Sequence, residues 1–431
     1  MSVPTLSPAS LPVSSRPSTR VHSTSTRSTG SRPRSVIVAP ELGISDSPAA
    51  AVYRVARARG PVARDDAAKA TGLSIATVNR QVSALLDLGV LRERADLAPS
   101  GAVGRPRVPF EVNHDPYLTV GIHIGAVVTS IIASDIRGRV LGAVEIPTPQ
   151  SPAPDALAAI ARSARAFASR WHRRRPLWAG VAVGGRVDAR TGAVDHARLG
   201  WSAAPVGSVI AAGLGLPVSV APHVEAMAAS ELLLTPDTID RAAPTDTGLY
   251  FYARETAGVA ISIGGRVHTP ANGPGSIAHL PTGSSARCSC GAVGCLEATV
   301  SDRAILTAAA KAGIASTDAS GALSMATVVK AATDGSVVAR DLLVQRAEVL
   351  GRTVAILRDL FNPDRVILGG QAFTAYEAGI PHVAAAFARA STAGRQDIRV
   401  TGFGNRVQEY ASTVVSLSRL FADPLATMRR V

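Results

Sequence analysis

The chain has 431 residues, which is more than one ordinary domain contains, and 46% of them are hydrophobic. The length predicts two or three domains, and the apolar content excludes a wholly disordered chain. The formal net charge is +13, and residues 1–114 carry 15 basic and 8 acidic side chains, a net charge of +7. Because over half of the excess lies in this N-terminal part, we expect a nucleic-acid partner to bind there.

The N-terminal segment, residues 1–46, is rich in serine, threonine, proline and arginine, and Glu41 is its first acidic residue. Such a composition cannot bury enough apolar surface to offset the loss of chain entropy, so it predicts a disordered basic tail. Two interpretations stay open: a solvated tail without a function, and a basic arm that adds non-specific affinity for phosphates.

Residues 47–112 have the pattern of a small helical domain that ends in two strands. Ser47 and Pro48 are typical N-cap and first-turn residues, Gly60 ends the helix that they open, and Ser74 is the N-cap of a later helix. Helices are predicted over residues 49–59, 64–70 and 74–88, and strands over residues 90–94 and 107–112. This order indicates a winged helix-turn-helix DNA-binding domain, and the alternative is a three-helix subdomain without a DNA function.

The third helix carries side chains suited to reading DNA. Four apolar residues at helical spacing form the stripe expected to pack on the other helices: Ile75, Val78, Val82 and Leu85. On the opposite face, Asn79 and Arg80 are residue types that make bidentate contacts with adenine and guanine edges. Arginines of the wing loop are expected to enter a narrow minor groove. The predicted DNA contacts are Ser74, Ala76, Thr77, Asn79, Arg80, Ser83, Arg105 and Arg107.

From residue 117 onward the pattern is that of an α/β fold. Short apolar runs predict strands over residues 118–124, 127–134, 140–146, 177–183, 218–221, 248–253, 258–263 and 365–368. Helical patterns cover residues 154–171, 224–234, 302–312, 324–333 and 336–361. Strand-rich openings followed by helices occur twice, so we expect residues 117–431 to form two related lobes.

One histidine and three cysteines lie close together in the sequence: His279, Cys288, Cys290 and Cys295. Three cysteines cannot build a full disulfide framework, which indicates a reducing compartment. One imidazole and three thiolates form a tetrahedral ligand set for zinc, and four protein ligands leave no position for water, so the expected role of the zinc is structural. Free buried cysteines and a redox pair are the alternatives.

Two further observations argue against a secreted or membrane-bound protein. The N-terminus lacks the apolar run of a signal peptide. The uncharged stretch 199–222 is interrupted by Pro205, Pro217 and Pro222, so we expect no membrane span. The expected location is the cytoplasm.

Two segments around the cysteines resemble the signature of the ROK family, which is named for repressors, open reading frames and sugar kinases. These are residues 273–279 and 288–297, and the segments 199–201, 220–231 and 361–370 add to the resemblance. The resemblance implies two ribonuclease-H-like lobes of the actin/hexokinase superfamily, preceded by the winged helix-turn-helix domain. It also implies zinc at the four residues named above and a sugar or sugar-phosphate effector in the cleft between the lobes.

Four positions depart from the sugar kinases of this family. His123 stands where these kinases have an aspartate that helps to hold the metal nucleotide, and His223 stands where they have the catalytic base. Glu255 lies in a loop that lacks the glycines of the second phosphate loop, and Ser276 replaces a sugar-contacting glutamate. Because an imidazole cannot replace a carboxylate as a magnesium ligand, we expect a protein that is not an enzyme.

The same departures alter the predicted effector site. The resemblance leaves His279 and Glu297 as partners for hydroxyl groups of a ligand, and it places His223 and Ser276 beside them. Two interpretations stay open: the cleft binds an effector that differs from the usual hexose, or it has lost its ligand and only supports the dimer. His123 and His223 are either a pair that responds to pH or metals, or ordinary cleft histidines.

Together these features predict a cytoplasmic transcriptional regulator, a repressor of carbohydrate-related genes that responds to a sugar-like effector and has no kinase activity. We expect a homodimer or higher homo-oligomer on a roughly palindromic double-stranded DNA operator, with structural zinc. Two alternatives remain: a sugar kinase with an appended DNA-binding domain, and a DNA-binding regulator that senses no small molecule.

Overall fold

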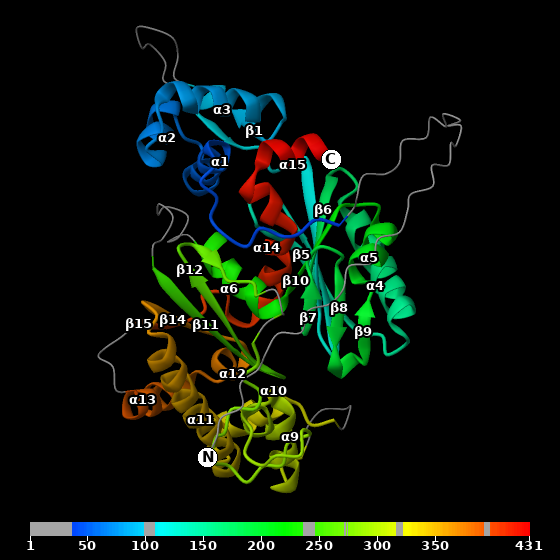
Figure 1. The fold of residues 1–431 in the computed structure, drawn as a ribbon, viewed down its shortest axis with the longest axis vertical. Coiled ribbons are helices and arrows are strands. Elements are labelled where there is room, and N and C mark those ends of the chain that lie inside the picture. Colours follow the sequence, from blue (N-terminus) through cyan, green and yellow to red (C-terminus); the bar gives the residue numbers. More distant parts are fainter. Residues whose placement is uncertain are drawn as a thin grey trace, which may run out of the picture. The chain divides into compact units, whose positions relative to one another are not determined.

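The computed structural model describes residues 37–98, 108–235, 246–270, 273, 275–315, 322–391 and 397–431. Residues 1–36 of the predicted tail, and the wing residues Arg105 and Arg107, lie outside these ranges. Within them the chain forms a small N-terminal domain followed by two α/β lobes, which Figure 1 colours in sequence order.

The N-terminal domain consists of helices followed by a two-stranded antiparallel ribbon. Its elements are α1 (Pro48–Arg59), α2 (Arg64–Thr71), α3 (Ile75–Asp87), β1 (Leu91–Glu93) and β2 (Phe110–Val112). The Ser47 hydroxyl accepts a hydrogen bond from the backbone N–H of Ala50 at 3.2 Å, and the Ser74 hydroxyl accepts one from Thr77 at 3.2 Å. Both predicted N-caps are therefore confirmed, together with the order of the elements.

The core of this domain matches the predicted apolar stripe with one exception. Val78, Val82 and Leu85 are fully buried, whereas Ile75 is 49% exposed. Because Ile75 is the first residue of α3, its side chain lies at the end of the stripe rather than beneath the neighbouring helices.

Residues 37–46 form an extended segment that pairs with the body of the protein, so the prediction of disorder is wrong for this part of the tail. Ile37 makes a parallel β-bridge with Val218, and Gly43 makes an antiparallel β-bridge with Arg266. The side chain of Leu42 is buried. Composition did not reveal this order because the backbone partners of the segment lie far along the chain.

The first lobe is built on a sheet in the order β10-β6-β3-β4-β5. Its strands are β3 (Tyr117–Ile124), β4 (Val128–Ser134), β5 (Val140–Pro147), β6 (Arg175–Val183) and β10 (Val218–Pro222). Neighbours β3, β4 and β5 are antiparallel, whereas β6 and β10 run parallel to β3. The lobe also contains α4 (Ala153–Ala168), α5 (Val206–Leu214) and a small sheet of β7 (Arg186–Asp188), β8 (Ala193–His196) and β9 (Trp201–Ala204).

The second lobe repeats this strand plan in the order β15-β14-β11-β12-β13. Its strands are β11 (Thr247–Ala253), β12 (Ala257–Ile263), β13 (Arg266–Val267), β14 (Arg365–Gly369) and β15 (Asp397–Val400). Its helices are α8 (Leu296–Val300), α9 (Asp302–Lys311), α10 (Met325–Thr333), α11 (Val337–Phe361), α12 (Gln371–Thr374) and α13 (Ile380–Ala390). Again the first strands are antiparallel and the later ones parallel, so the expectation of two related lobes is confirmed.

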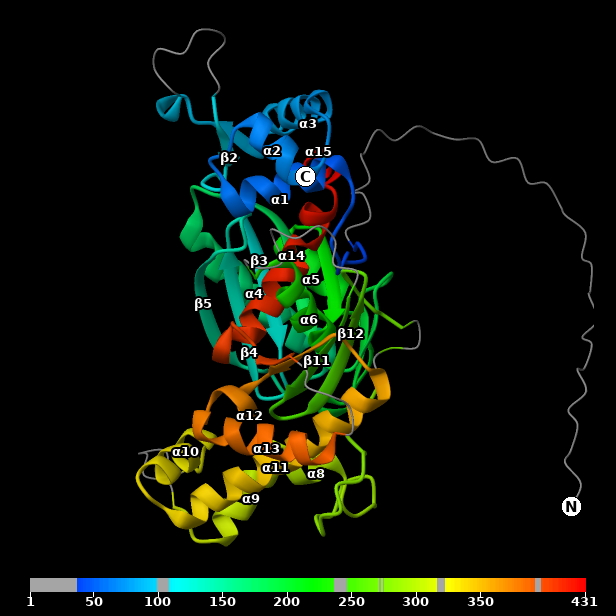
Figure 2. The same ribbon diagram turned by 90° about the vertical axis from the view of Figure 1, so that its left-hand side faces the viewer.

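Helix α14 (Val407–Ala422), which precedes α15 (Pro424–Arg430), packs against β3, β6 and α6 (His223–Leu233) (Figure 2). Gly121 of β3 and Gly180 of β6 are paired in register beneath it. A Cβ atom at Gly180 would lie only 2.1 Å from the backbone nitrogen of Ser416. The glycine pair therefore allows the helix to lie closer to the sheet than any side chain would permit.

Helices α5, α13 and α14 were not predicted from the sequence, nor were the short strands β7 to β9. Most of α14 is buried, including Ser412, Thr413, Ser416 and Ser418, so its polar residue types do not mark an exposed face. Helix α5 lies in the uncharged stretch 199–222 and is too short to cross a bilayer. Across the described ranges, no helix combines the length and apolar character that a membrane span requires.

Candidate functional site

The predicted DNA-reading residues of α3 lie on its outward face. Ala76, Asn79, Arg80 and Ser83 are exposed, opposite the buried stripe of the helix. Ser74 is exposed as well, and its hydroxyl donates a hydrogen bond of 3.0 Å to that of Thr77. Within the described residues no hydrogen bond or ion pair holds the side chain of Asn79 or Arg80. These two side chains are therefore available for a partner.

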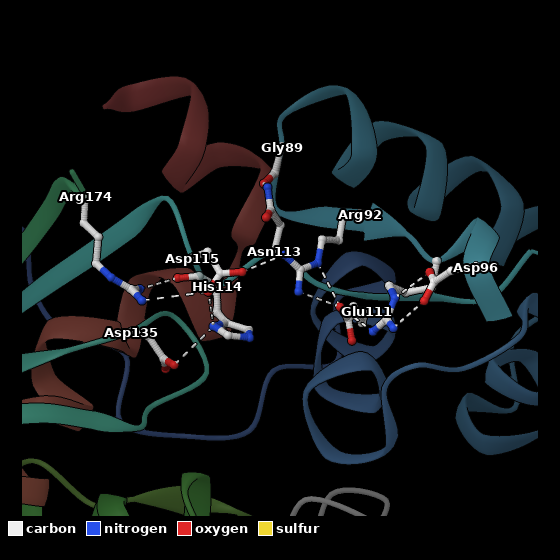
Figure 3. A network of polar contacts seen from close by, with 10 residues as sticks. Gly89, Arg92, Asp96, Glu111, Asn113, His114, Asp115, Asp135 and Arg174 are labelled. Atoms are coloured by element: carbon white, nitrogen blue, oxygen red, sulfur yellow. Dashed lines mark hydrogen bonds and ion pairs between the residues drawn. The ribbon is translucent and has the colours of Figure 1, made fainter.

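The arginines of the ribbon differ from Arg80, because the protein itself neutralises them. Arg92 contacts Glu111 at 2.8 Å and Asp115 at 2.6 Å, and Arg94 contacts Asp96 at 2.7 Å. Figure 3 shows this chain of contacts along β1 and β2. The positive charge of the ribbon is thus used to hold the domain together, and α3 presents the available arginine.

The same network continues into the first lobe (Figure 3). Asp115 also lies 3.8 Å from Arg174, which donates a hydrogen bond of 2.7 Å to the backbone oxygen of His114. The His114 ring in turn lies 3.7 Å from Asp135. The ribbon is therefore fixed to the lobe at the point where the chain passes from one to the other.

Helix α1 provides a second attachment. The Arg57 guanidinium lies 3.9 Å from the centre of the Phe421 ring in α14 and donates a hydrogen bond to the Leu233 oxygen at the end of α6. The Tyr53 hydroxyl donates to the oxygen of Ile136. Because burial lowers the pKa of Arg57 to about 10, the cation still persists at neutral pH. A movement of α14 or α6 would therefore displace the residues that α1 packs against.

The four predicted metal ligands are brought together. The candidate ligand atoms of His279, Cys288, Cys290 and Cys295 all lie within 4.8 Å of one another. The sulfurs of Cys290 and Cys295 are 3.7 Å apart, as are the sulfur of Cys288 and the Nδ1 of His279. Two thiolates at the usual zinc distance of about 2.3 Å and a tetrahedral angle would be about 3.8 Å apart, so the spacing suits a tetrahedral metal.

A cavity of about 500 Å³ lies between the two lobes. Polar side chains that line it are His123, His196, Arg198, Tyr252, Arg254 and Gln408. Of the predicted effector residues, His223, Ser276 and Glu297 also line the cavity. His279 does not, because its ring belongs to the metal cluster. Among the described residues, the two carboxylates that line the cavity face a cation: Arg198 lies 2.6 Å from Glu297 and 3.6 Å from Glu255.

Two of the histidines that line the cavity, His123 and His223, stack on each other. The rings of His123 and His223 are stacked with centroids 5.7 Å apart, and within the described part of the chain neither His123 Nε2 nor His223 Nδ1 has a hydrogen-bond partner. Burial, reinforced by His196, lowers the pKa of His223 to about 4. Burial and the neighbouring His223 lower the pKa of His123 well below its ordinary value. Both rings are therefore neutral at pH 7 and carry unused hydrogen-bonding atoms.

The sequence did not point to His196 and Gln408, two polar residues of the cavity. His196 comes from the small sheet that was not predicted, and Gln408 comes from the unpredicted helix α14. Gln408 accepts a hydrogen bond of 2.7 Å from Arg254 and donates one of 3.0 Å to the Tyr252 hydroxyl. No local signal marks these residues, since the cavity is assembled from segments far apart in the chain.

Comparison with known proteins identifies the relatives of the chain. Residues 119–399 match the model of the ROK family. A protein of Mycobacterium tuberculosis named "Transcriptional regulator Rv0485" is 56% identical over 401 residues, which cover 91% of this chain and 90% of that protein. The "N-acetylglucosamine repressor" of Escherichia coli O157:H7 is 25% identical over 347 residues, which cover 78% of this chain and 82% of the repressor.

Solved structures agree with this fold. A ROK family transcriptional regulator, a homologue of the E. coli MLC protein, has a TM-score of 0.73 at 24% identity and covers 89% of this chain and 98% of its own. The ROK family glucokinase from Streptomyces griseus, solved with glucose and AMPPNP, has a TM-score of 0.60 at 24% identity and covers 70% of this chain and 99% of its own. The actin/hexokinase-like fold predicted from the sequence is thus confirmed, and the chain belongs to the ROK family.

Proposed function

We propose that the chain is a DNA-binding transcriptional regulator, a repressor of carbohydrate-related genes, in which α3 reads the operator. The observation that carries this proposal is the exposed face of α3, where Asn79 and Arg80 have no hydrogen-bond or ion-pair partner among the residues that the structure describes. The names of the relatives support the same function. Residues 47–112 would form the reading head, and residues 117–431 the body, which would act in the cytoplasm.

The reading head would work as part of a homodimer or higher homo-oligomer. A recognition helix that enters the major groove places its N-terminal residues on base edges, and a two-fold pair of such helices requires half-sites roughly 34 Å apart or a multiple of that spacing. The operator would then be approximately palindromic. The wing arginines Arg105 and Arg107 would add minor-groove contacts.

The cavity would bind a sugar-like effector rather than support phosphoryl transfer. Magnesium requires oxygen ligands, but Arg198 occupies both carboxylates that line the cavity. The position of the catalytic base holds the neutral His223. Hydroxyl groups of a ligand would meet His223, Ser276 and Glu297.

Helix α14 would connect the cavity with the reading head. Gln408 in its first turn contacts Arg254 in the cavity, and Phe421 in its last turn contacts Arg57 of α1. Helix α14 is one continuous helix, so a ligand that displaces Gln408 would shift α14 and with it the position at which α1 packs. Such coupling requires that the effector bind the two states of the regulator with different affinity.

The four-residue metal cluster would hold zinc in a structural role. All four positions around the ion would be filled by protein, which leaves none for a reacting water. The hydrogen bonds that Cys288 receives from Cys290 lower the pKa of its thiol, whereas burial and the neighbouring thiols raise that of Cys295, so a metal would have to displace the proton of Cys295 as it binds. The metal would thereby fix the loop between the cavity residues Ser276 and Glu297.

Substitution of Arg80 by alanine tests the proposed operator surface. The loss of a bidentate base contact should weaken binding to a duplex from the chain's own upstream region by about 1–3 kcal/mol and relax the preference at one base pair. Affinity for a random duplex should change much less. Arg340→Ala, which removes the same charge from an exposed position in α11, is the control. Equal losses on both duplexes would contradict direct base reading.

Two measurements separate the alternatives. An ADP-release assay with hexoses and amino sugars should show no turnover, and turnover that disappears in His223→Ala would establish a sugar kinase. A thermal-shift screen with hexoses, N-acetylhexosamines and their phosphates should raise the unfolding midpoint for at least one compound, because a ligand of the native state stabilises it. No shift with any of them would favour a regulator without a sugar-like effector.

A further inference from the structure

Residues 37–46, named here the clasp, join the two lobes by backbone pairing. At its first end, the N–H of Val38 donates to the oxygen of Val218 at 2.9 Å, and the Ser219 hydroxyl donates to the oxygen of Val38 at 2.7 Å. Val218 and Ser219 belong to β10, the edge strand of the first lobe. The clasp thus begins as an addition to that sheet.

The other end of the clasp pairs with the edge of the second sheet. The N–H of Ile44 donates to the oxygen of Gly265, and the N–H of Val267 donates to the oxygen of Leu42, both at 2.9 Å. Val267 belongs to β13, the edge strand of the second lobe, and the side chains of Leu42 and Ile44 are buried. One short segment is therefore fixed to both sheets.

Between these ends, Glu41 binds two cations of the body. Its carboxylate lies 3.1 Å from Arg266 of β13 and 3.1 Å from Arg419 of α14. Arg419 is two residues before Phe421, which contacts the reading head. Glu41 therefore ties the clasp to the helix that runs from the cavity to α1.

The clasp continues directly into the reading head. Ser45 accepts a hydrogen bond of 3.2 Å from Arg54 through its backbone oxygen, and Ser47 is the N-cap of α1. The Ser47 hydroxyl also donates to the oxygen of Ala422 at 3.3 Å. No free linker thus separates the pairing with β13 from the first helix of the head.

This arrangement limits how the lobes can move. The five residues from Val38 to Leu42, joined by four peptide steps, span at most about 14 Å when fully extended. A change in the separation of the lobes around the cavity would shift β10 relative to β13, and the clasp would have to resist the shift or release one of its ends. Either response changes the backbone that leads into α1.

We propose that the clasp couples opening and closing of the cavity to the position of the reading head. This inference rests on the proposed function, since it assigns the clasp a role in how the regulator responds at its operator. By reciprocity, DNA bound to the head must alter the clasp, just as movement of the lobes alters the head.

Hydrogen exchange on the full chain, with and without a duplex from its own upstream region, tests this inference. We expect duplex binding to change the exchange rates of peptides over residues 37–46 and 265–268 several-fold, although neither belongs to the proposed reading helix α3. Gly43→Val should abolish that change, because a side chain at Gly43 would meet Arg266 atoms at 3.0–3.1 Å and separate the clasp from β13. Gly402→Val is the control, since a Cβ there has no atom within 4 Å.

Glu41→Gln is the milder variant if Gly43→Val does not fold. It keeps the size of the side chain but loses the charge that binds Arg266 and Arg419, and it should reduce the duplex-induced change in exchange two- to five-fold. If the wild-type protein binds the duplex but exchange over both peptides does not change, the proposed coupling role of the clasp is wrong, while the proposed function stands. Failure of the wild type to bind any such duplex would overturn the proposed function as well.

Discussion

Helix α3 and the cavity differ in how far their polar side chains are exposed to solvent. On α3, Asn79 and Arg80 project from the surface while Val78 and Val82 fill the core behind them. In the cavity, His123, His196 and Tyr252 are themselves buried: His123 is 3% exposed, and a ring nitrogen of that residue has no partner among the described residues.

As a result, DNA affinity and folding stability depend on different residues in α3, whereas in the body the residues that form the cavity also stabilise the fold. An exposed side chain can be exchanged at little cost to folding, whereas a buried polar group or a closely packed backbone contributes to the folded state itself. Substitutions on the face of α3 should therefore change affinity for DNA alone. Substitutions in the body should lower the stability of the fold, and they should weaken DNA binding only because less of the protein is folded.

The largest effect is expected from Cys290→Ser, which breaks the metal cluster. Loss of one thiolate should release the metal and destabilise the second lobe by several kcal/mol, because the free energy of binding a structural zinc contributes to folding. Metal analysis and the thermal midpoint measure both effects. Ser289→Ala, an exposed neighbour between two ligands, should change neither. Unchanged metal content in Cys290→Ser would remove the metal assignment.

A large effect is also expected where α14 meets the sheet. Gly180→Ala would place a methyl group 2.1 Å from the backbone nitrogen of Ser416, so the helix would have to move away, at a cost of about 3 kcal/mol or more. Gly402→Ala introduces the same group into open space and should leave the denaturation midpoint unchanged. Equal midpoints for the two variants would show that the body tolerates change as well as α3 does.

The contrast between these regions also explains what the sequence could predict. The caps at Ser47 and Ser74 and the stripe of α3 are local patterns, and the metal ligands span few residues, so both were found. The pairing of Arg198 with Glu297 and the clasp join segments about a hundred or more residues apart, which no periodicity records. The proximity of His123 and His223 was one of two interpretations that the family resemblance left open. Helix α14 was missed for another reason, since serine and threonine residues such as Ser412 and Ser416 are buried in it.

A smaller effect, confined to a window of pH, is expected from His223. Its pKa is about 4 in the folded chain and 6.5 ordinarily, so the unfolded state takes up the proton first as the pH falls. The histidine should therefore cost stability progressively from pH 6.5 down to pH 4, by about 3 kcal/mol in total. His223→Gln should lose less stability than the wild type over that window, as measured by denaturant unfolding at each pH.

The buried carboxyl of Glu225 gives the control of opposite sign. Burial raises its pKa from 4.5 to about 7, so the folded state holds the proton longer and loses stability as the pH rises from 4.5 to 7. Glu225→Gln should remove that loss and leave the decline at acid pH in place. Parallel profiles for the wild type and His223→Gln would mean that the ring of His223 is solvated in the cavity.

The smallest effect is expected at the N-terminus of α3, where Ser74 both caps the helix and is a predicted DNA contact. Ser74→Ala removes the hydroxyl that accepts the N–H of Thr77, and the loss of an N-cap costs about 1 kcal/mol. Hydrogen exchange of α3 should therefore accelerate about five-fold, with a modest loss of affinity for every duplex. Ser83→Ala is the same substitution on the exposed face of the same helix and should leave exchange unchanged. If both variants exchange at the wild-type rate, α3 is held by its buried stripe alone, and its cap serves only to present an N–H group to a phosphate.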